Sequence, residues 1–293
     1  MKVLLASDGS PPAAAACRLI ERIGDRARTE ITVVTVVPPP AQPAPIFSSI
    51  MQSSSDDKRR RATEVAARAA GSLASNGFRA ETAVAEGPAG AEIIRMVERG
   101  RFDLTVLGGG SRTWIGNMLL GSVSTYVLHS SPSSTLIVHE CASDKQSSRV
   151  LVGADGSSES RLAIDVFSKF ADPSRCETLV ASVVYPPERL PYPYPVPGGD
   201  RERELEKHLT EQAEVVAEGG AERLRRAAFT SRSAVLVGSP SPLLLKEAEN
   251  IAADLVVVGS RGFGPIGRAL MGSVSDHVSR HSRAALVARS LSI

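Results

Sequence analysis

The chain has 293 residues, a length that suits two domains of ordinary size better than one. Hydrophobic residues make up 42% and charged residues 23%, the composition of a soluble globular protein, and a formal net charge of +2 gives no strong field that would favour nucleic acid or anionic lipid. The three cysteines, Cys17, Cys141 and Cys176, form no Cys-x-x-Cys pair, so the sequence predicts neither a zinc site nor a disulfide framework and fits a reducing cytoplasm.

The N-terminal stretch, MKVLLASDGSPPAAAACRLI, has the positive start and the small residues before Cys17 that a lipoprotein signal would show. Asp8 interrupts its apolar run after five residues, however, and a signal needs about 7–15 apolar residues without interruption. No apolar run reaches the roughly 20 residues of a membrane helix. We therefore expect a cytoplasmic protein that begins with a buried strand, Val3–Ala6, followed by a turn and a helix that Ser10 caps.

The sequence repeats itself. The segment Phe102–Ser131 returns without a gap as Ala253–Ser282, and 13 of the 29 positions from Asp103 to Ser131 are identical to their partners. The opening VLLASDGS likewise returns as VLVGADGS, in which Ser157 takes the place of Ser10. Repetition at this spacing predicts two homologous domains, residues 1–140 and residues 147–293, joined by a polar linker.

Each repeat shows five apolar strands, with helices expected between them. In chain order the strands are Val3–Ala6, Ile31–Val37, Ala80–Gly87, Leu104–Gly108 and Ser134–Val138 in the first repeat, and Val150–Gly153, Thr178–Val184, Ser231–Gly238, Leu255–Gly259 and Ala284–Ala288 in the second. Long helices are expected near 58–76 and 201–228, and the last helices should start at Ser122 and Ser273. This alternation predicts an α/β, Rossmann-like fold, in which each domain is a five-stranded, mostly parallel sheet with helices on both faces.

Glycines follow the fourth strand of the second repeat at regular distances. Gly259, Gly262 and Gly272 have the spacing G-x2-G-x9-G, and Ser273 comes next. A glycine at such a place permits a positive φ or a close approach of another group. The helix that opens at Gly272-Ser273 presents free N–H groups and a positive dipole end, which together favour an anion such as phosphate. The alternative is that these are turn glycines and a helix cap, because short glycine motifs often match by chance.

Several side chains near these glycines could help to bind an anion. The hydroxyls of Ser273 and Ser275 are candidate donors, and Arg261 and Arg268 are candidate positive charges.

At these residues the sequence resembles the universal stress protein family in its tandem-domain form. The signature G-x2-G-x9-G-(S/T) is matched in full, and so is the ADGS that contains Asp155. The resemblance covers both repeats and implies that the second repeat binds ATP, with or without Mg²⁺. It implies that Asp155 and Val183 lie at the adenine, that Gly259, Ser260 and Gly262 lie along the ribose and phosphates, and that Gly272, Ser273, Val274 and Ser275 hold the phosphate tail.

The first repeat departs from the signature, so it is expected to hold a weaker second site. Ser111 replaces the second glycine, and Gly110 lies one residue early. We expect Gly262 to adopt a positive φ beside the phosphates, a conformation in which the Cβ of Ser111 would be strained. The residues of this weaker site would be Asp8, Val36, Gly108, Gly121, Ser122, Val123 and Ser124.

Other patterns have weaker interpretations. Gly262–Gly267, GFGPIG, is a literal G-x-G-x-x-G, but the strand ends earlier at Gly259 and no acidic residue follows the next strand, which disfavours a dinucleotide. His277 and His281 lie four apart without an acidic third ligand, so no metal site is predicted. The proline-rich segments 38–55 and 185–199 are either disordered loops or a lid or partner surface over the nucleotide.

We therefore expect an ATP-binding regulatory protein of the stress response. No catalytic constellation is visible, so we expect no enzyme, or at most slow hydrolysis of ATP. The alternatives are a nucleotide-free scaffold of the same fold and an enzyme that uses the cleft for a nucleotide substrate. Besides ATP we expect an unidentified protein partner, but no nucleic acid and no membrane. The family's dimers imply that the two repeats pair as an internal pseudo-dimer through their last strands, and a homodimer is also compatible with the sequence.

Overall fold

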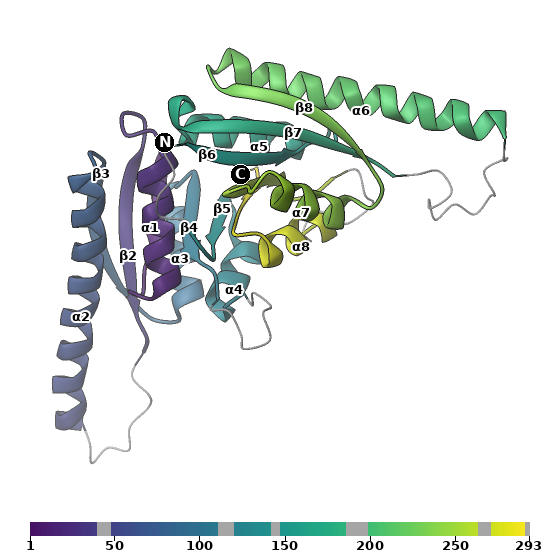
Figure 1. The fold of residues 1–293 in the computed structure, drawn as a ribbon. Helices are drawn as coiled ribbons and strands as arrows, with labels where there is room; N and C mark the ends of the chain where they lie inside the picture. The colour runs from purple at the N-terminus through teal and green to yellow at the C-terminus, as the bar shows by residue number, and fades with distance from the viewer. Residues whose placement is uncertain (40–47, 111–119, 142–146, 186–198, 263–270, 291–293) are drawn as a thin grey trace. The chain divides into compact units, whose positions relative to one another are not determined.

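The computed structural model describes residues 1–39, 48–110, 120–141, 147–185, 199–262 and 271–290, and for 48–55 the backbone alone. The chain divides into two compact units, residues 1–143 with 290–293 (unit 1) and residues 144–289 (unit 2). Each unit is a five-stranded parallel sheet with helices on both faces, which confirms the fold class predicted from the sequence (Figure 1).

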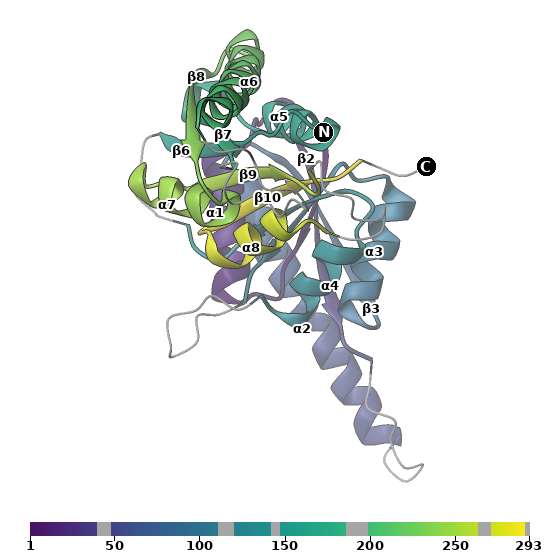
Figure 2. The same ribbon diagram turned by 90° about the vertical axis from the view of Figure 1, so that its right-hand side faces the viewer.

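Unit 1 contains the sheet order β3-β2-β1-β4-β5, in which all neighbours are parallel. Helices α1 and α2 contact each other, and so do α3 and α4, which lie side by side in Figure 2. The elements in chain order are β1 (Lys2–Ala6), α1 (Pro11–Ile23), β2 (Glu30–Val37), α2 (Ser48–Ser75), β3 (Arg79–Glu86), α3 (Ala89–Gly100), β4 (Leu104–Gly108), α4 (Ser122–Ser130) and β5 (Ser134–Val138).

Unit 2 repeats this arrangement with the order β10-β9-β6-β7-β8, again all parallel. Helices α5 and α6 lie on one face of its sheet, and α7 and α8 lie on the other (Figure 1). The elements are β6 (Ser148–Gly153), α5 (Ser158–Phe170), the 3-10 helix η2 (Pro173–Arg175), β7 (Cys176–Val184), α6 (Asp200–Arg226), β8 (Thr230–Val237), α7 (Pro240–Asn250), β9 (Leu255–Gly259), α8 (Ser273–His281) and β10 (Ala284–Ala288).

The inner strands explain the apolar runs of the sequence. Residues 3–5 of β1 and residues 150–152 of β6 are completely buried. Helices cover both faces of each sheet, so successive side chains on these strands all point into a core, and no polar alternation remains. The edge strands β3 and β8 keep several exposed residues instead.

The predicted helix caps are confirmed. The Ser10 hydroxyl accepts a hydrogen bond from the Ala13 N–H (3.4 Å), and the Ser157 hydroxyl accepts one from the Ser160 N–H (3.1 Å). Within the described part of the chain, no helix is long and apolar enough to cross a membrane. The pairing of the repeats through their last strands stays a prediction.

One helix begins earlier than expected. Helix α2 starts at Ser48 rather than near Lys58, so it includes the end of the segment 38–55 that was expected to be a loop or lid. The last proline of that segment is Pro45, and the stretch from Ser48 to Ser75 contains no proline that would break a helix. Residues 40–47 and 186–198 of the two proline-rich segments lie outside the described residues.

An aspartate ties the fourth strand of each unit to the first. The Asp254 N–H donates to the Arg149 carbonyl oxygen (2.8 Å), and the Arg149 N–H donates to Asp254 Oδ2 (3.1 Å). Asp103 makes the same reciprocal pair with Lys2, at 2.9 and 2.8 Å. Asp254 is buried, whereas Asp103 is exposed, so the same contact is shielded from water to different degrees.

Replacing Asp254 with Ala should lower the free energy of unfolding by about 1–3 kcal/mol, because the part-buried Arg149 N–H loses its acceptor. Asp103→Ala should cost less, since water can replace the lost acceptor there. Urea unfolding of both variants measures the difference. Equal losses, or a larger loss for Asp103→Ala, would contradict this account.

Candidate functional site

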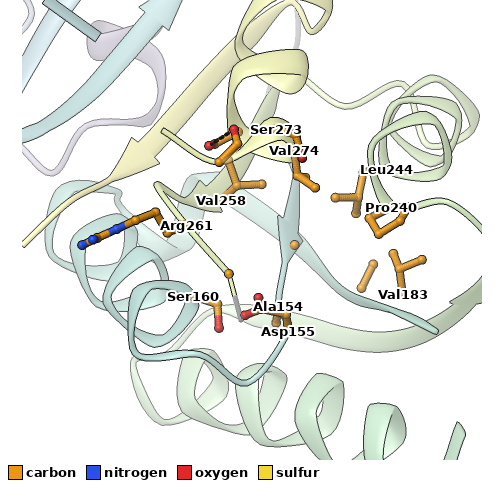
Figure 3. Close-up of a pocket in the computed structure, with 16 residues that line it drawn as sticks. Ala154, Asp155, Ser160, Val183, Pro240, Leu244, Val258, Arg261, Ser273 and Val274 are labelled. Carbon is orange, nitrogen blue, oxygen red and sulfur yellow. Dashed lines mark hydrogen bonds between the residues drawn. The ribbon is translucent and has the colours of Figure 1, made fainter. Parts of the chain in front are cut away.

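A pocket of about 270 Å³ opens at the carboxyl ends of the strands of unit 2 (Figure 3). Strands β6 and β9 are neighbours in the sheet, and the chain leaves them at Gly153 and Gly259. Ligands of parallel α/β sheets bind at this edge. The described residues that line the pocket are Gly153, Ala154, Asp155, Ser160, Ala181, Val183, Pro240, Leu244, Val258, Gly259, Arg261, Gly262, Gly272, Ser273, Val274 and Ser275.

The pocket brings together all but one of the site residues predicted for the second repeat. Asp155, Val183, Gly259, Gly262, Gly272, Ser273, Val274 and Ser275 all line it. Ser260 is not among the lining residues, and its side chain is buried. Its N–H donates to the Ala288 carbonyl (2.8 Å), and its own carbonyl accepts from the Gly272 N–H (2.8 Å). Ser260 therefore holds the start of α8 against the end of β9.

The pocket has an apolar end and a polar end. Val183 from β7 and Pro240 and Leu244 from α7 lie together on one side in Figure 3. Ser273 and Val274, in the first turn of α8, lie at another side. An elongated ligand with an apolar ring at one end and negative charge at the other would match this division.

The first turn of α8 is open to a ligand. No side chain caps this helix, and the N–H groups of Ser273, Val274 and Ser275 find no acceptor among the described residues. Three free N–H groups and the helix dipole favour an anion there. The Ser275 hydroxyl was expected to help, but it donates to the carbonyls of Ser260 (3.0 Å) and Gly272 (2.8 Å) and is thus already used.

Gly262 has a different role from the one that the sequence suggested. Its φ lies outside the left-handed region, so the prediction of a positive φ is wrong. A Cβ built on Gly262 would lie 2.4 Å from Oδ2 of Asp155. The other oxygen of that carboxylate, Oδ1, accepts from the Ser157 N–H (3.0 Å). The glycine therefore makes room for a carboxylate that is already oriented by its own turn.

Gly259 makes room for backbone. A Cβ on Gly259 would lie 2.7 Å from the carbonyl carbon of Glu159, in the first turn of α5. Gly108 is the matching residue of unit 1, where a Cβ would lie 2.6 Å from the carbonyl carbon of Pro12. Each glycine lets the first helix of its unit pack directly on the end of the fourth strand.

Arg261 was expected to add positive charge to the anion site. Its guanidinium instead pairs with Glu159, with Nη2 3.2 Å from Oε1. Figure 3 shows the guanidinium directed away from Val183, Pro240 and Leu244. Arg268 lies outside the described residues, as does most of the GFGPIG segment.

The residues predicted for the weaker site of unit 1 occupy the matching edge of their own sheet. Asp8 follows β1 and accepts from the Ser10 N–H through Oδ1 (2.9 Å), and Val36 lies near the end of β2. Gly121 precedes the first turn of α4, which contains Ser122, Val123 and Ser124, and the Ser124 hydroxyl donates to the Gly108 carbonyl (2.6 Å). Ser111, which replaces the second glycine, lies outside the described residues.

Sequence reasoning missed the wall that α7 contributes. Pro240 begins this helix just after Gly238, which has a φ of +142°, and Leu244 follows within α7. A glycine followed closely by a proline after the third strand was a usable signal, because it places a helix start at the carboxyl edge of the sheet.

No metal site was predicted for His277 and His281. In the structure their rings stack, with centroids 4.2 Å apart. Among the described residues, no three His, Cys, Asp or Glu side chains lie together as a metal site would need.

Comparison with known proteins points to one family. A model of the universal stress protein family matches the chain twice, over residues 1–139 and 147–288. The universal stress protein Rv2623 of Mycobacterium tuberculosis is 34% identical over 186 residues, which cover 61% of this chain and 58% of the relative. A universal stress protein of Mycolicibacterium smegmatis is 32% identical over 180 residues, or 60% of this chain and 58% of the relative. The chain thus matches over less than two thirds of the length of these curated relatives.

Solved structures agree on the fold. The crystal structure of a universal stress protein from Archaeoglobus fulgidus superimposes with a TM-score of 0.66, covers 98% of both chains and is 24% identical in sequence. A protein of unknown function from Pseudomonas aeruginosa, PA1789, superimposes with a TM-score of 0.61 at 12% identity, over 99% of this chain and 92% of its own. At such identities the likeness concerns the fold.

The two pocket glycines should respond differently to an added methyl group. Gly259→Ala should lower the free energy of unfolding by about 1–3 kcal/mol, because the new Cβ meets the backbone of α5, which cannot move aside. Gly262→Ala should cost less than about 1 kcal/mol, since the end of the Asp155 side chain can rotate away. Urea unfolding measures both, and similar losses would contradict the distinction.

Proposed function

Because the chain belongs to the universal stress protein family, we propose that it is a regulatory protein of the stress response that binds ATP in the pocket of unit 2. The observation that carries the proposal is the pairing of an apolar wall with an uncapped helix N-terminus in one cavity. ATP has the matching division, with a flat heterocycle at one end and a polyanion at the other.

The adenine fits the apolar end of the pocket. Val183, Leu244 and Val258 offer the apolar contacts that a purine ring needs. The Asp155 carboxylate also lines the pocket and accepts only one described hydrogen bond, from the Ser157 N–H. A carboxylate has room for further donors, so it can accept from the adenine amino group or from a ribose hydroxyl.

The phosphates fit the first turn of α8. The free N–H groups of Ser273, Val274 and Ser275 can donate to phosphate oxygens, and the helix dipole adds to this attraction. Mg²⁺ would be carried in by the triphosphate itself, because magnesium at nucleotide sites is commonly held by substrate phosphates together with water.

We propose a binding protein rather than an enzyme. The pocket-lining residues that are described include a single carboxylate, Asp155, and no histidine or cysteine. That carboxylate belongs to the turn that follows β6, whereas the phosphates would lie at the first turn of α8. Asp155 is therefore poorly placed to activate a water molecule at the terminal phosphate. Any hydrolysis of ATP should therefore be slow. A cytoplasmic location and an unidentified protein partner complete the proposal.

The two units are proposed to bind ATP unequally. In unit 2 the loop after β9 approaches the Asp155 carboxylate through a glycine that lacks a Cβ. The matching residue of unit 1 is Ser111, whose Cβ would meet Asp8 if the loop followed the same path. We expect about one tightly bound ATP per chain and a second site that is weak or empty.

Asp155 and Asp8 form a matched pair for testing the proposed contact of Asp155 with the adenine or ribose. Both orient a turn at a helix start, through bonds of 3.0 and 2.9 Å to Ser157 and Ser10. Asp155→Ala should weaken tight ATP binding about tenfold or more, since a bond to a charged acceptor contributes roughly 1.5–3 kcal/mol. Asp8→Ala should lose the same turn contact and leave the tight phase intact. Isothermal calorimetry with ATP measures both, and equal effects would reduce Asp155 to a structural role.

Blocking each helix N-terminus identifies the tight site. Gly272→Glu should abolish the tight phase, because a bulky anionic side chain would occupy the first turn of α8, whereas Gly121→Glu should spare it. Calorimetry and mass spectrometry of the nucleotide that the purified protein carries measure the outcome. Loss of the tight phase only in Gly121→Glu would mean that the sites are reversed. A purified protein that neither carries nor binds nucleotide would favour the scaffold alternative.

A further inference from the structure

An ion pair crosses the edge of the pocket of unit 2. Arg261 Nη2 lies 3.2 Å from Glu159 Oε1, and the Ser158 hydroxyl donates to the other oxygen, Oε2 (2.7 Å). Both side chains of the pair are partly buried, with 26% of Arg261 and 22% of Glu159 exposed. Arg261 itself lines the pocket, yet its guanidinium points away from the apolar wall (Figure 3).

The backbone of Arg261 lies beside the proposed phosphate site. A Cβ built on Gly272, the residue that caps α8, would lie 3.4 Å from the Cα of Arg261. From this origin a long arginine side chain can be directed either toward α5, as it is here, or toward the first turn of α8. Arg261 can therefore exchange Glu159 for a bound anion by changing its side-chain rotamer.

A second arginine adds positive charge nearby. Burial and, to a lesser extent, the positive charge of Arg261 lower the pKa of Arg289, just after β10. Arg261 is thus attracted by the Glu159 carboxylate and repelled by the Arg289 guanidinium. Repulsion of this kind offsets part of the attraction of Glu159 and makes the ion pair easier to break.

Unit 1 lacks both members of the pair. The residues at the corresponding positions are Pro12, against which Gly108 packs as Gly259 packs against Glu159, and Gly110, one residue before Ser111. The pair therefore belongs to the repeat with the complete signature, although packing of the first helix does not need it.

We propose that Glu159 holds Arg261 out of the phosphate site until a polyphosphate competes for it, so that the pair makes unit 2 select nucleotides by phosphate charge. The inference rests on the proposed nucleotide binding and adds the residue that senses the phosphates. A triphosphate can win this competition, because it carries several negative charges and guanidinium binds phosphate in a bidentate manner. Adenosine offers nothing to Arg261 and leaves the pair closed.

The test compares ATP with adenosine by calorimetry on the full chain. Glu159→Gln should tighten ATP binding about two- to fivefold, because a partly exposed ion pair no longer has to be broken. Arg261→Gln should weaken ATP binding by up to about tenfold. Neither change should alter the affinity for adenosine. In the double variant Glu159→Gln/Arg261→Gln, the gain in ATP affinity from Glu159→Gln should disappear, because there is no arginine left to release.

Asp165→Asn is the matched control. It removes one negative charge from the same helix, α5, and breaks an ion pair with Arg223 of α6 that is more exposed, with 33% of Asp165 and 53% of Arg223 accessible. Its affinity for ATP should equal that of the wild type. A gain like that of Glu159→Gln would mean that net charge, rather than release of Arg261, is responsible, and would overturn the inference.

Other results separate this inference from the proposed function. Wild-type protein that binds ATP, together with a Glu159→Gln variant that binds it equally or more weakly, would overturn the inference alone. A gain that persists in the double variant would do the same. A wild type that binds neither ATP nor adenosine would overturn both. Should Glu159→Gln fail to fold, Arg261→Gln decides, because unchanged affinity for ATP would rule out a phosphate-sensing arginine.

Discussion

The contact on which each unit depends is the packing of its first helix against the end of its fourth strand. At Gly259 and Gly108 a Cβ would lie 2.7 and 2.6 Å from helix backbone, so neither position can hold a side chain without moving that helix. Because the helix starts directly on the strand end, the turn before it is carried to the carboxyl edge of the sheet. In unit 2 this places Asp155 opposite the loop that leaves β9.

The pocket of unit 2 follows from that placement. Gly262 can lie beside the Asp155 carboxylate because it has no Cβ. The next described residues lead to Gly272, after which α8 begins. Ser260 joins the two segments, since its carbonyl accepts from both the Gly272 N–H and the Ser275 hydroxyl. The start of α8 is thereby anchored from behind, which leaves the N–H groups of its first turn free for a ligand rather than for the protein itself.

The two units show that scaffold and site are separable. They share the reciprocal aspartate bonds between the first and fourth strands, the serine caps and the glycine at the strand end. They differ in the residues of the loop and the helix turn that face the ligand edge, where unit 2 has Glu159 and Arg261. Loops tolerate such divergence because few buried contacts depend on them.

The sequence by itself determined the fold class and indicated where the candidate site lies. Apolar runs that alternate with helices specify a parallel sheet, and the repeated glycines after β9 mark its ligand edge, since both signals are local in the chain. Tertiary structure alone decided what the glycines accommodate. At Gly262 it is a carboxylate from another loop, where the sequence suggested a positive φ, and at Arg261 it is an ion pair with α5. These contacts join residues about a hundred positions apart, and such pairings exist only once the sheet has brought the strand ends together.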